Sequence, residues 1–312
     1  MFMRTALSPL LAAALLAGCV TDQEETPIVD ALPTADSVQI RLPQNNARSV
    51  GQLADYYAVT RAVTRDLNAG AAWVLLLVHA VVQFPATSVD GDVYTWGPWT
   101  GSALDPAEWK LVVTANGDDT YDWELAGRSK STPEDGFLAV ISGHAVPGDE
   151  PHRGTGDFTI DFDAGERVNP IDNTPDTGRL EVAYDLENRD GTAASLTMHA
   201  EGIDSFGDEE SFDYAYAENQ DGSGDFQFDF EADVDEDGGA AEDGVIRSRW
   251  ESDGAGRADV RLSAGDLELV VEASECWDEQ FRRTYYTDSA DFLPTEGDAA
   301  ACAFADADLP DL

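Results

Sequence analysis

Basic residues are scarce in this sequence. The chain has 312 residues with 62 acidic and 18 basic side chains, so its formal net charge is -44. Only two of the basic residues are lysines, Lys110 and Lys130. Nucleic-acid binding requires a basic surface, so this composition excludes nucleic acid as a partner. The 43% of hydrophobic residues is enough for a core, so wholesale disorder is excluded as well.

Recognisable catalytic motifs are also missing. The sequence has no H-E-x-x-H, no G-x-S-x-G, no P-loop and no dinucleotide fingerprint. Of the four histidines, His79 lies in an apolar run and is expected to be a hydrogen-bonded core residue. His144 and His152 flank a loop where a metal pair is an alternative of low specificity. The sequence therefore predicts a protein that is not an enzyme; a hydrolase with scattered catalytic residues stays open as an alternative.

No hydrophobic run is long enough for a membrane-spanning helix, which needs about 20 apolar residues. The longest N-terminal run, Ala6 to Ala17, follows the positive charge of Arg4 and ends in Leu16-Ala17-Gly18-Cys19. This pattern is typical of an export signal that is removed from the mature chain.

The residues Leu16 to Cys19 resemble the bacterial lipobox. That resemblance implies cleavage of a signal peptide at residues 1–18, lipidation of Cys19 and attachment to the membrane through acyl chains. In lipoproteins of this kind an aspartate after the cysteine marks retention in the inner membrane; Val20 stands here, so the outer membrane is expected. Residues 19–36 then form a lipidated, flexible tether with several acids and prolines.

The two remaining cysteines, Cys276 and Cys302, form an even pair in an exported chain. Because the periplasm and the cell surface are oxidising, we expect a disulfide that staples residues 274–312 to the domain. A metal site or a nucleophilic thiol is the alternative, but no histidine lies near either cysteine in the sequence.

The globular part, residues 37–273, begins with three expected elements. Alternation over Val38–Leu42 predicts a short strand, and the spacing of apolar residues over Leu53–Leu67 predicts an amphipathic helix. After a break at Asn68-Ala69-Gly70, the apolar run Ala71–Val82 predicts a helix buried on all sides.

Downstream, apolar and polar residues alternate in short segments separated by turn dipeptides such as Asn116-Gly117 and Asp190-Gly191. We expect roughly ten to twelve antiparallel strands. The predicted fold is mainly β with an N-terminal helical segment, a curved antiparallel meander (a half-barrel or barrel-like sheet) wrapped around the buried apolar helix. The acids between residues 201 and 260 fall mostly on outward strand positions and in turns, which predicts a solvated surface.

Two sequence features are candidate ligand sites. Asp233, Asp235 and Asp237 with Gly238 match the opening of an EF-hand-type loop, but Gly244 stands where the bidentate glutamate should be. A solvated hairpin is the favoured interpretation and a calcium site the alternative; no other cofactor is expected. Trp96 and Trp99 could present two indoles to a carbohydrate or apolar ligand, although core packing is more common for such residues.

The overall layout resembles uncharacterised bacterial outer-membrane lipoproteins with a lipobox, a tether and a helix-plus-β-meander domain carrying W-G-P-W after the helix. That resemblance brings no activity. We expect a non-enzymatic structural or binding component of the envelope, with its membrane contact through the anchor. The alternative is a carrier that holds an acyl chain or other apolar ligand between sheet and helix.

Overall fold

The computed structural model describes residues 27–34, 37–43, 53–171, 177–187, 193–203, 209–232, 240–265 and 267–309. The predicted lipidation site Cys19 and the predicted calcium ligands Asp233, Asp235 and Asp237 lie outside these ranges. The structure therefore tests neither the lipidation site nor the calcium site.

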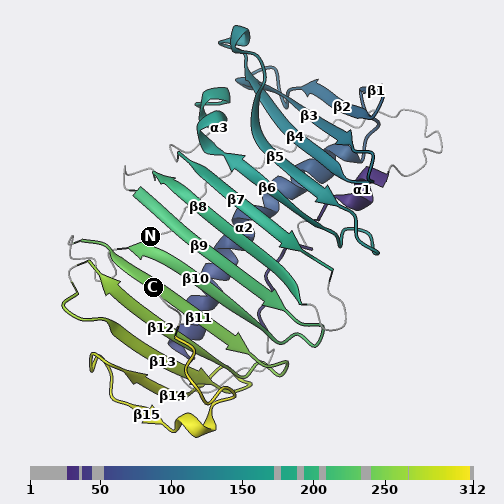
Figure 1. Ribbon diagram of the computed structural model, residues 1–312. Coiled ribbons are helices and arrows are strands. Elements are labelled where there is room, and N and C mark those ends of the chain that lie inside the picture. Colours follow the sequence, from purple (N-terminus) through teal and green to yellow (C-terminus); the bar gives the residue numbers. More distant parts are fainter. Residues whose placement is uncertain are drawn as a thin grey trace. The chain divides into compact units, whose positions relative to one another are not determined.

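Within these ranges, fifteen strands form one antiparallel meander in which the order in the sheet is the order in the sequence (Figure 1). The strands are β1 (Ser88–Asp90), β2 (Val93–Trp99), β3 (Ala107–Ala115), β4 (Tyr121–Ser129), β5 (Leu138–Val146), β6 (Thr155–Asp161), β7 (Arg179–Asp185), β8 (Ala194–Ile203), β9 (Glu209–Glu218), β10 (Gly224–Ala232), β11 (Glu242–Trp250), β12 (Gly256–Ala264), β13 (Val271–Trp277), β14 (Arg283–Asp288) and β15 (Glu296–Gly297). Because β1 and β15 stand at the two ends of this order, the sheet is open. The predicted antiparallel β-meander is confirmed, with more strands than expected.

The described ranges contain few helices. They are α1 (Pro27–Ala31), α2 (Asp55–Val82) and α3 (Phe162–Val168), with short 3-10 turns at Pro133–Asp135 and Ala299–Ala301. The chain divides into two compact units. Unit 1 contains α1, the second half of α2, β1–β7 and α3; unit 2 contains the first half of α2 and β9–β15 with most of β8.

In unit 2, one face of the sheet is apolar and aromatic. Tyr216, Phe226 and Ser248 are successive partners across β9, β10 and β11, and the next row contains Tyr214 and Phe228. All five side chains are buried. The alternate residues, among them Arg247 and Arg249, therefore lie on the opposite face of the same strands.

The first half of α2 packs on the apolar face of unit 2. The Thr60 hydroxyl oxygen lies 2.6 Å from that of Ser248 on β11. Tyr57 stacks on Phe281 with ring centroids 4.3 Å apart, and it also contacts Trp277. Helix and sheet are thus in direct contact at these positions.

The carboxylate of Glu275 on β13 fixes the beginning of α2. The backbone N–H groups of Asp55 and Tyr56 donate to its two oxygens at 3.0 and 2.5 Å. The Arg283 guanidinium donates to the same carboxylate at 2.5 Å. Glu275 is fully buried, and a buried charge requires compensating partners. The N-terminus of α2 and the guanidinium of Arg283 provide this compensation.

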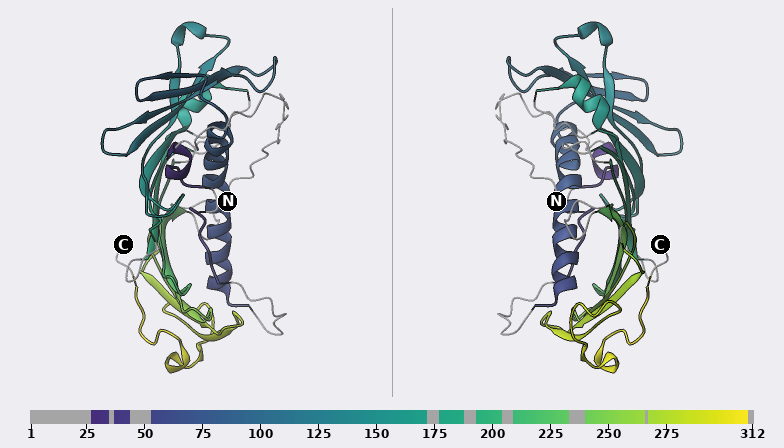
Figure 2. Two further views of the ribbon diagram at one scale, coloured as in Figure 1. Left: turned by 90° about the vertical axis from the view of Figure 1, so that its right-hand side faces the viewer. Right: turned by 90° about the vertical axis from the view of Figure 1, so that its left-hand side faces the viewer.

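In unit 1, α1 lies beside the second half of α2 (Figure 2). A ring nitrogen of His79 on α2 lies 2.8 Å from the carbonyl oxygen of Pro33, and His152 contacts the carbonyl of Leu32 at 2.9 Å. The His79 and His152 rings are 5.1 Å apart in an edge-on arrangement. Burial lowers the pKa of His79, so its neutral form fits this carbonyl-rich site. The expectation of a hydrogen-bonded histidine at position 79 is confirmed.

Three local predictions differ from the structure. The segment Val38–Leu42 is not a strand. Its backbone bonds to a side chain and not to a neighbouring strand, because the Asn68 amide accepts from the N–H of Ile40 and donates to its carbonyl. The same Asn68 was expected to mark a helix break, whereas α2 runs through residues 68–70 without interruption. Phe162 continues the apolar alternation of Phe158 and Ile160, which predicts the end of a strand. Instead it begins α3, which Asp161 caps by accepting from the Ala164 N–H at 2.8 Å.

Burial along α2 also differs from the prediction. Leu75, Val78 and Val82 are buried, but Ala80 is exposed, so the described side chains of this half are covered on one side only. Residues 27–34, expected to belong to the flexible tether, contain α1 with Ile28, Ala31 and Leu32 buried in unit 1.

Candidate functional site

A buried ionic cluster lies on the face of unit 2 opposite the aromatic rows. Arg257 and Asp259 on β12 are 3% and 0% exposed. The Arg257 Nε donates to Asp259 Oδ1 at 2.8 Å, and the Ser274 hydroxyl donates to the same oxygen at 2.6 Å. Arg257 also donates to Ser274 through Nη2 at 3.0 Å. The strand register explains this cluster, because Asp259 and Ser274 are direct partners on β12 and β13.

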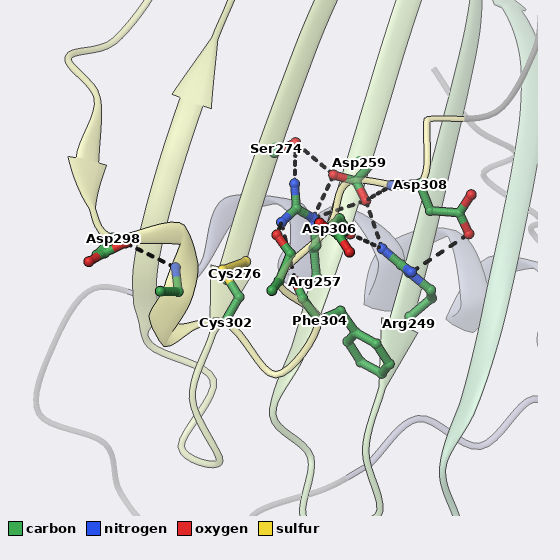
Figure 3. The surroundings of a disulfide bond; sticks show 12 residues. Arg249, Arg257, Asp259, Ser274, Cys276, Asp298, Cys302, Phe304, Asp306 and Asp308 are labelled. Atoms are coloured by element: carbon green, nitrogen blue, oxygen red, sulfur yellow. Dashed lines mark hydrogen bonds and ion pairs between the residues drawn. A yellow bond between two sulfur atoms is a disulfide. The ribbon is translucent and has the colours of Figure 1, made fainter.

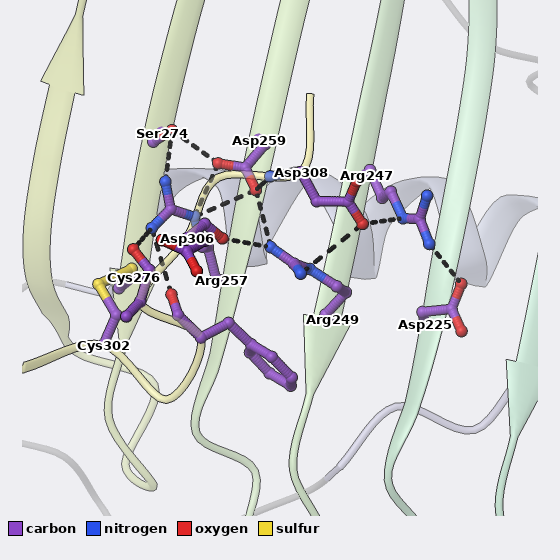
Figure 4. A network of polar contacts seen from close by, with 12 residues as sticks. Asp225, Arg247, Arg249, Arg257, Asp259, Ser274, Cys276, Cys302, Asp306 and Asp308 are labelled. Atoms are coloured by element: carbon purple, nitrogen blue, oxygen red, sulfur yellow. Dashed lines mark hydrogen bonds and ion pairs between the residues drawn. A yellow bond between two sulfur atoms is a disulfide. The ribbon is translucent and has the colours of Figure 1, made fainter. Parts of the chain in front are cut away.

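The cluster continues across β11 and β10 as a row of alternating charges (Figure 4). Arg249 Nη2 lies 3.2 Å from Asp259 Oδ2. Arg247, two residues earlier on the same face, lies 3.8 Å from the Asp225 carboxylate on β10. Burial raises the pKa of Asp225, while the guanidinium groups of Arg247 and Arg249 act in the opposite direction.

The C-terminal segment 304–308 lies across this row (Figure 3). Arg257 Nη1 donates to the carbonyl oxygens of Phe304 and Ala305 at 3.2 and 3.0 Å. Arg249 Nη2 donates to the carbonyl of Asp306 at 2.9 Å. The backbone N–H of Asp308 donates to Asp259 Oδ2 at 3.0 Å.

Two side chains of the segment make further contacts. The Arg249 guanidinium carbon lies 5.0 Å from the centre of the Phe304 ring, a cation–π geometry. The Asp308 carboxylate lies 3.3 Å from Arg247 Nε and 3.7 Å from Arg249 Nη1. Four side chains contact the segment, and Ser274 fixes two of them, Arg257 and Asp259. We call these five side chains, Arg247, Arg249, Arg257, Asp259 and Ser274, the arginine strip.

The disulfide fixes where the segment begins. Cys276 and Cys302 are bonded, with their Cα atoms 5.6 Å apart, and Cys276 is the direct partner of Arg257 across β12 and β13. Phe304 follows Cys302 by two residues, so the staple delivers the tail to the arginine strip (Figure 3). The predicted Cys276–Cys302 disulfide is confirmed.

This arrangement is suited to holding a peptide. Its polar groups are three guanidinium groups, one carboxylate and one hydroxyl, and each group takes part in at least one ion pair or hydrogen bond. Donors aimed at three successive backbone carbonyls and an acceptor aimed at a backbone N–H recognise an extended chain.

The tryptophan pair is only half accessible. Trp96 is 4% exposed and its indole N–H donates to the carbonyl of Phe84 at 2.7 Å. Trp99 is half-buried and lies opposite Trp109 on β3. A ligand would therefore reach Trp99 and not the Trp96 ring; the binding role itself stays a prediction.

The two histidines that were expected to flank a loop make separate contacts, and His144 lies on β5. His144 Nδ1 lies 2.7 Å from the Asp122 carboxylate on β4, whereas His152 contacts Leu32. Among the residues that the structure describes, no group of three or more His, Cys, Asp or Glu side chains is placed to hold a metal ion.

The arginine strip was missed by the sequence analysis. The acids of residues 201–260 were expected to form a solvated surface, yet Asp259 and Glu242 in that span are buried. A signal was available: in a chain with so few basic residues, Arg247, Arg249 and Arg257 all fall at outward positions of two neighbouring strands.

Within the described ranges, no helix is long and apolar enough to cross a membrane. Comparison with known proteins finds no matching family model, no matching curated relative and no matching solved structure.

Proposed function

We propose that this chain is a non-enzymatic lipoprotein of the bacterial cell envelope, anchored at the outer membrane through Cys19, with a structural or binding role. The observation that supports it best is the Cys276–Cys302 disulfide. Disulfides persist in oxidising compartments, which include the envelope to which the Leu16–Cys19 sequence would send the chain. The described residues contain an arginine strip suited to binding a peptide. Among them we identify no nucleophile paired with a general base.

Cell fractionation tests the anchor. Cys19→Ser should move the protein from the membrane to the soluble fraction, because acyl chains would supply the membrane affinity that the net charge opposes. Val20→Asp is the matched control: it keeps the anchor and should shift the protein from the outer to the inner membrane. Retention of Cys19→Ser in the membrane would contradict the proposal, and an unchanged location of Val20→Asp would contradict the outer-membrane assignment.

Carriage of an apolar ligand is the second candidate, and one observation favours it. The buried Tyr214 hydroxyl on β9 has no hydrogen-bond partner in the structure, and burial raises its pKa well above the ordinary value. A polar ligand group on the aromatic face would satisfy that hydroxyl. Against it, α2 touches the sheet directly at Thr60, so no acyl chain fits between helix and sheet there.

Native mass spectrometry separates the two candidates. Protein purified from membranes should carry no mass beyond its covalent lipid if the role is structural or peptide-binding. A co-purifying lipid that is lost in Tyr214→Phe, but kept in the exposed-face control Tyr285→Phe, would favour the carrier.

A further inference from the structure

Residues 303–308, which we call the C-terminal tail, are held almost entirely by polar contacts. Ala303, Ala305, Asp306 and Ala307 are exposed, so the segment adds little apolar burial to the domain. Its backbone instead makes four hydrogen bonds to Arg257, Arg249 and Asp259. A tail that merely extended the core would bury apolar side chains, as each buried apolar side chain contributes the main driving force for packing.

The arginine strip is organised without the tail. Asp259 is held by Arg257 Nε, Ser274 and Arg249, all from the sheet. Arg257 is fixed on two sides, by Asp259 and Ser274, and turns its remaining nitrogen toward the tail carbonyls. A pre-formed set of donors lowers the entropic cost of binding.

The contacts also define a recognition pattern. The hydrogen bonds to residues 304, 305, 306 and 308 involve backbone atoms, so they do not depend on which side chains an extended peptide carries. Only two side chains are selected: the Phe304 ring by Arg249, and the Asp308 carboxylate by Arg247 and Arg249. The pattern is an aromatic residue followed, four residues later, by a carboxylate.

We propose that the arginine strip is a binding site for an extended peptide with a phenylalanine and, four residues on, an aspartate, and that residues 304–308 occupy it as an intramolecular ligand. This inference specifies the binding role proposed above. It does not depend on the anchor, since every contact lies within unit 2.

The linkage explains how the site is kept closed. The disulfide at Cys302 holds the tail within two residues of Phe304, which gives the tail an effective concentration in the mM range. A peptide supplied at µM concentration cannot displace it. Removing the tail, or its two selected side chains, should therefore open the site.

Fluorescence anisotropy tests the proposal with a labelled peptide of the sequence of residues 303–309. The proteins are the membrane-extracted wild-type chain and a variant ending at Ala303, which keeps the disulfide. We expect the shortened chain to bind the peptide and the wild-type chain to bind it at least about tenfold more weakly. A full-length Phe304→Ala, Asp308→Asn variant should bind it too, because its own tail competes less well.

Substitutions test the recognition pattern. In the shortened chain, Arg249→Gln should weaken binding by at least about tenfold, since it removes a carbonyl donor, an ion pair and a cation–π contact. Arg128→Gln is the matched control: it also removes one arginine, one paired with Glu108 in unit 1, and should leave binding unchanged. A peptide with alanine for Phe304 and asparagine for Asp308 should bind at least about tenfold more weakly.

Several results would overturn the inference. These are no binding to either folded variant, equal binding of the altered peptide, or equal effects of Arg249→Gln and Arg128→Gln. Failure of both tail variants to fold would also overturn it, because the tail would then be part of the core and not a ligand. None of these outcomes affects the membrane location, so the two proposals fail separately.

Discussion

Asp259 connects the sheet to the tail through a single carboxylate. It accepts hydrogen bonds from Arg257, Arg249, Ser274 and the backbone N–H of Asp308, which come from three strands and the C-terminal segment. A buried carboxylate is tolerated only when such partners balance its loss of hydration. Asp259 alternates with the inward residues Ala258 and Val260, so the sequence predicts an outward position for its side chain. The sequence does not reveal that the C-terminal segment covers this side chain.

Asp259→Asn tests this balance. The substitution keeps the shape but removes the charge that compensates Arg257 and Arg249, so the free energy of unfolding should fall by about 3–5 kcal/mol in urea denaturation. The control Asp213→Asn removes an exposed acid paired with His199 and should cost less than about 1 kcal/mol. Equal costs for the two variants would contradict a buried, compensated charge.

His79 should make stability depend on pH. Burial lowers its pKa, and His152 acts in the same direction, although the Pro33 carbonyl opposes them. The unfolded chain therefore takes up the proton more readily than the folded one. The stability that neutral His79 contributes is complete above about pH 6.5 and is lost as the pH falls through the lowered pKa.

His79→Gln isolates this effect, since glutamine still donates to the carbonyl but does not titrate. The melting temperature of wild type minus that of the variant should decrease between pH 7.5 and pH 5. His199→Gln, which removes a half-exposed histidine, corrects for losing a histidine elsewhere. A difference that stays constant across this range would show that His79 is not buried in its neutral form.

At the scale of elements, α2 begins where β13 supplies its cap. Glu275→Gln should weaken the two N–H bonds of Asp55 and Tyr56 and the pair with Arg283, lowering the free energy of unfolding by about 1.5–3 kcal/mol. Hydrogen exchange should rise at the first turn of the helix. Glu272→Gln on the same strand, which pairs with Arg261 at a more exposed position, should leave exchange at that turn unchanged. Unchanged exchange in Glu275→Gln would show that the cap contributes nothing.

The elements were predictable where local pattern decides them. The alternating pattern predicts strands around Lys110–Thr114 and Tyr121–Leu125, where β3 and β4 lie. The same pattern predicts an inward position for Phe226, which is buried. It failed where a distant side chain replaces a backbone partner: Asn68 keeps the segment around Ile40 out of the sheet.

The buried face of α2 shows a second limit. The apolar period placed Leu53 in the core, but Leu53 is 40% exposed, whereas Thr60 and Thr64 are buried. Each threonine hydroxyl donates to the carbonyl four residues earlier, at Tyr56 and Thr60, which satisfies it without water. Hydrophobicity alone does not reveal such a residue.

At the scale of the whole molecule, the disulfide closes a segment with a sequence separation of 26 residues. Replacing both cysteines by serine, Cys276→Ser with Cys302→Ser, should lower the free energy of unfolding by roughly 3–4 kcal/mol in the chain-entropy account. Urea denaturation of both proteins measures the difference. If wild type treated with a reductant keeps its full stability, the bond does not constrain the unfolded chain.

The arginine strip is a local cluster of basic side chains in a chain whose net charge is -44. The charge predicts that nucleic acid is not a partner, whereas the arginine strip places three basic side chains on one face of unit 2. These arginines contact an acidic segment of the same chain, in which Asp308 pairs with Arg247 and Arg249. The binding capacity that we propose therefore concerns a peptide, while the membrane attachment that we propose depends on lipid at Cys19.

The intact mass of the protein purified from membranes tests the central claim most directly. The account predicts a chain that begins at Cys19 and carries additional acyl mass on that residue. A mass equal to the uncut chain of 312 residues, or to a cut chain without added acyl groups, would contradict the proposal of a lipid-anchored envelope protein.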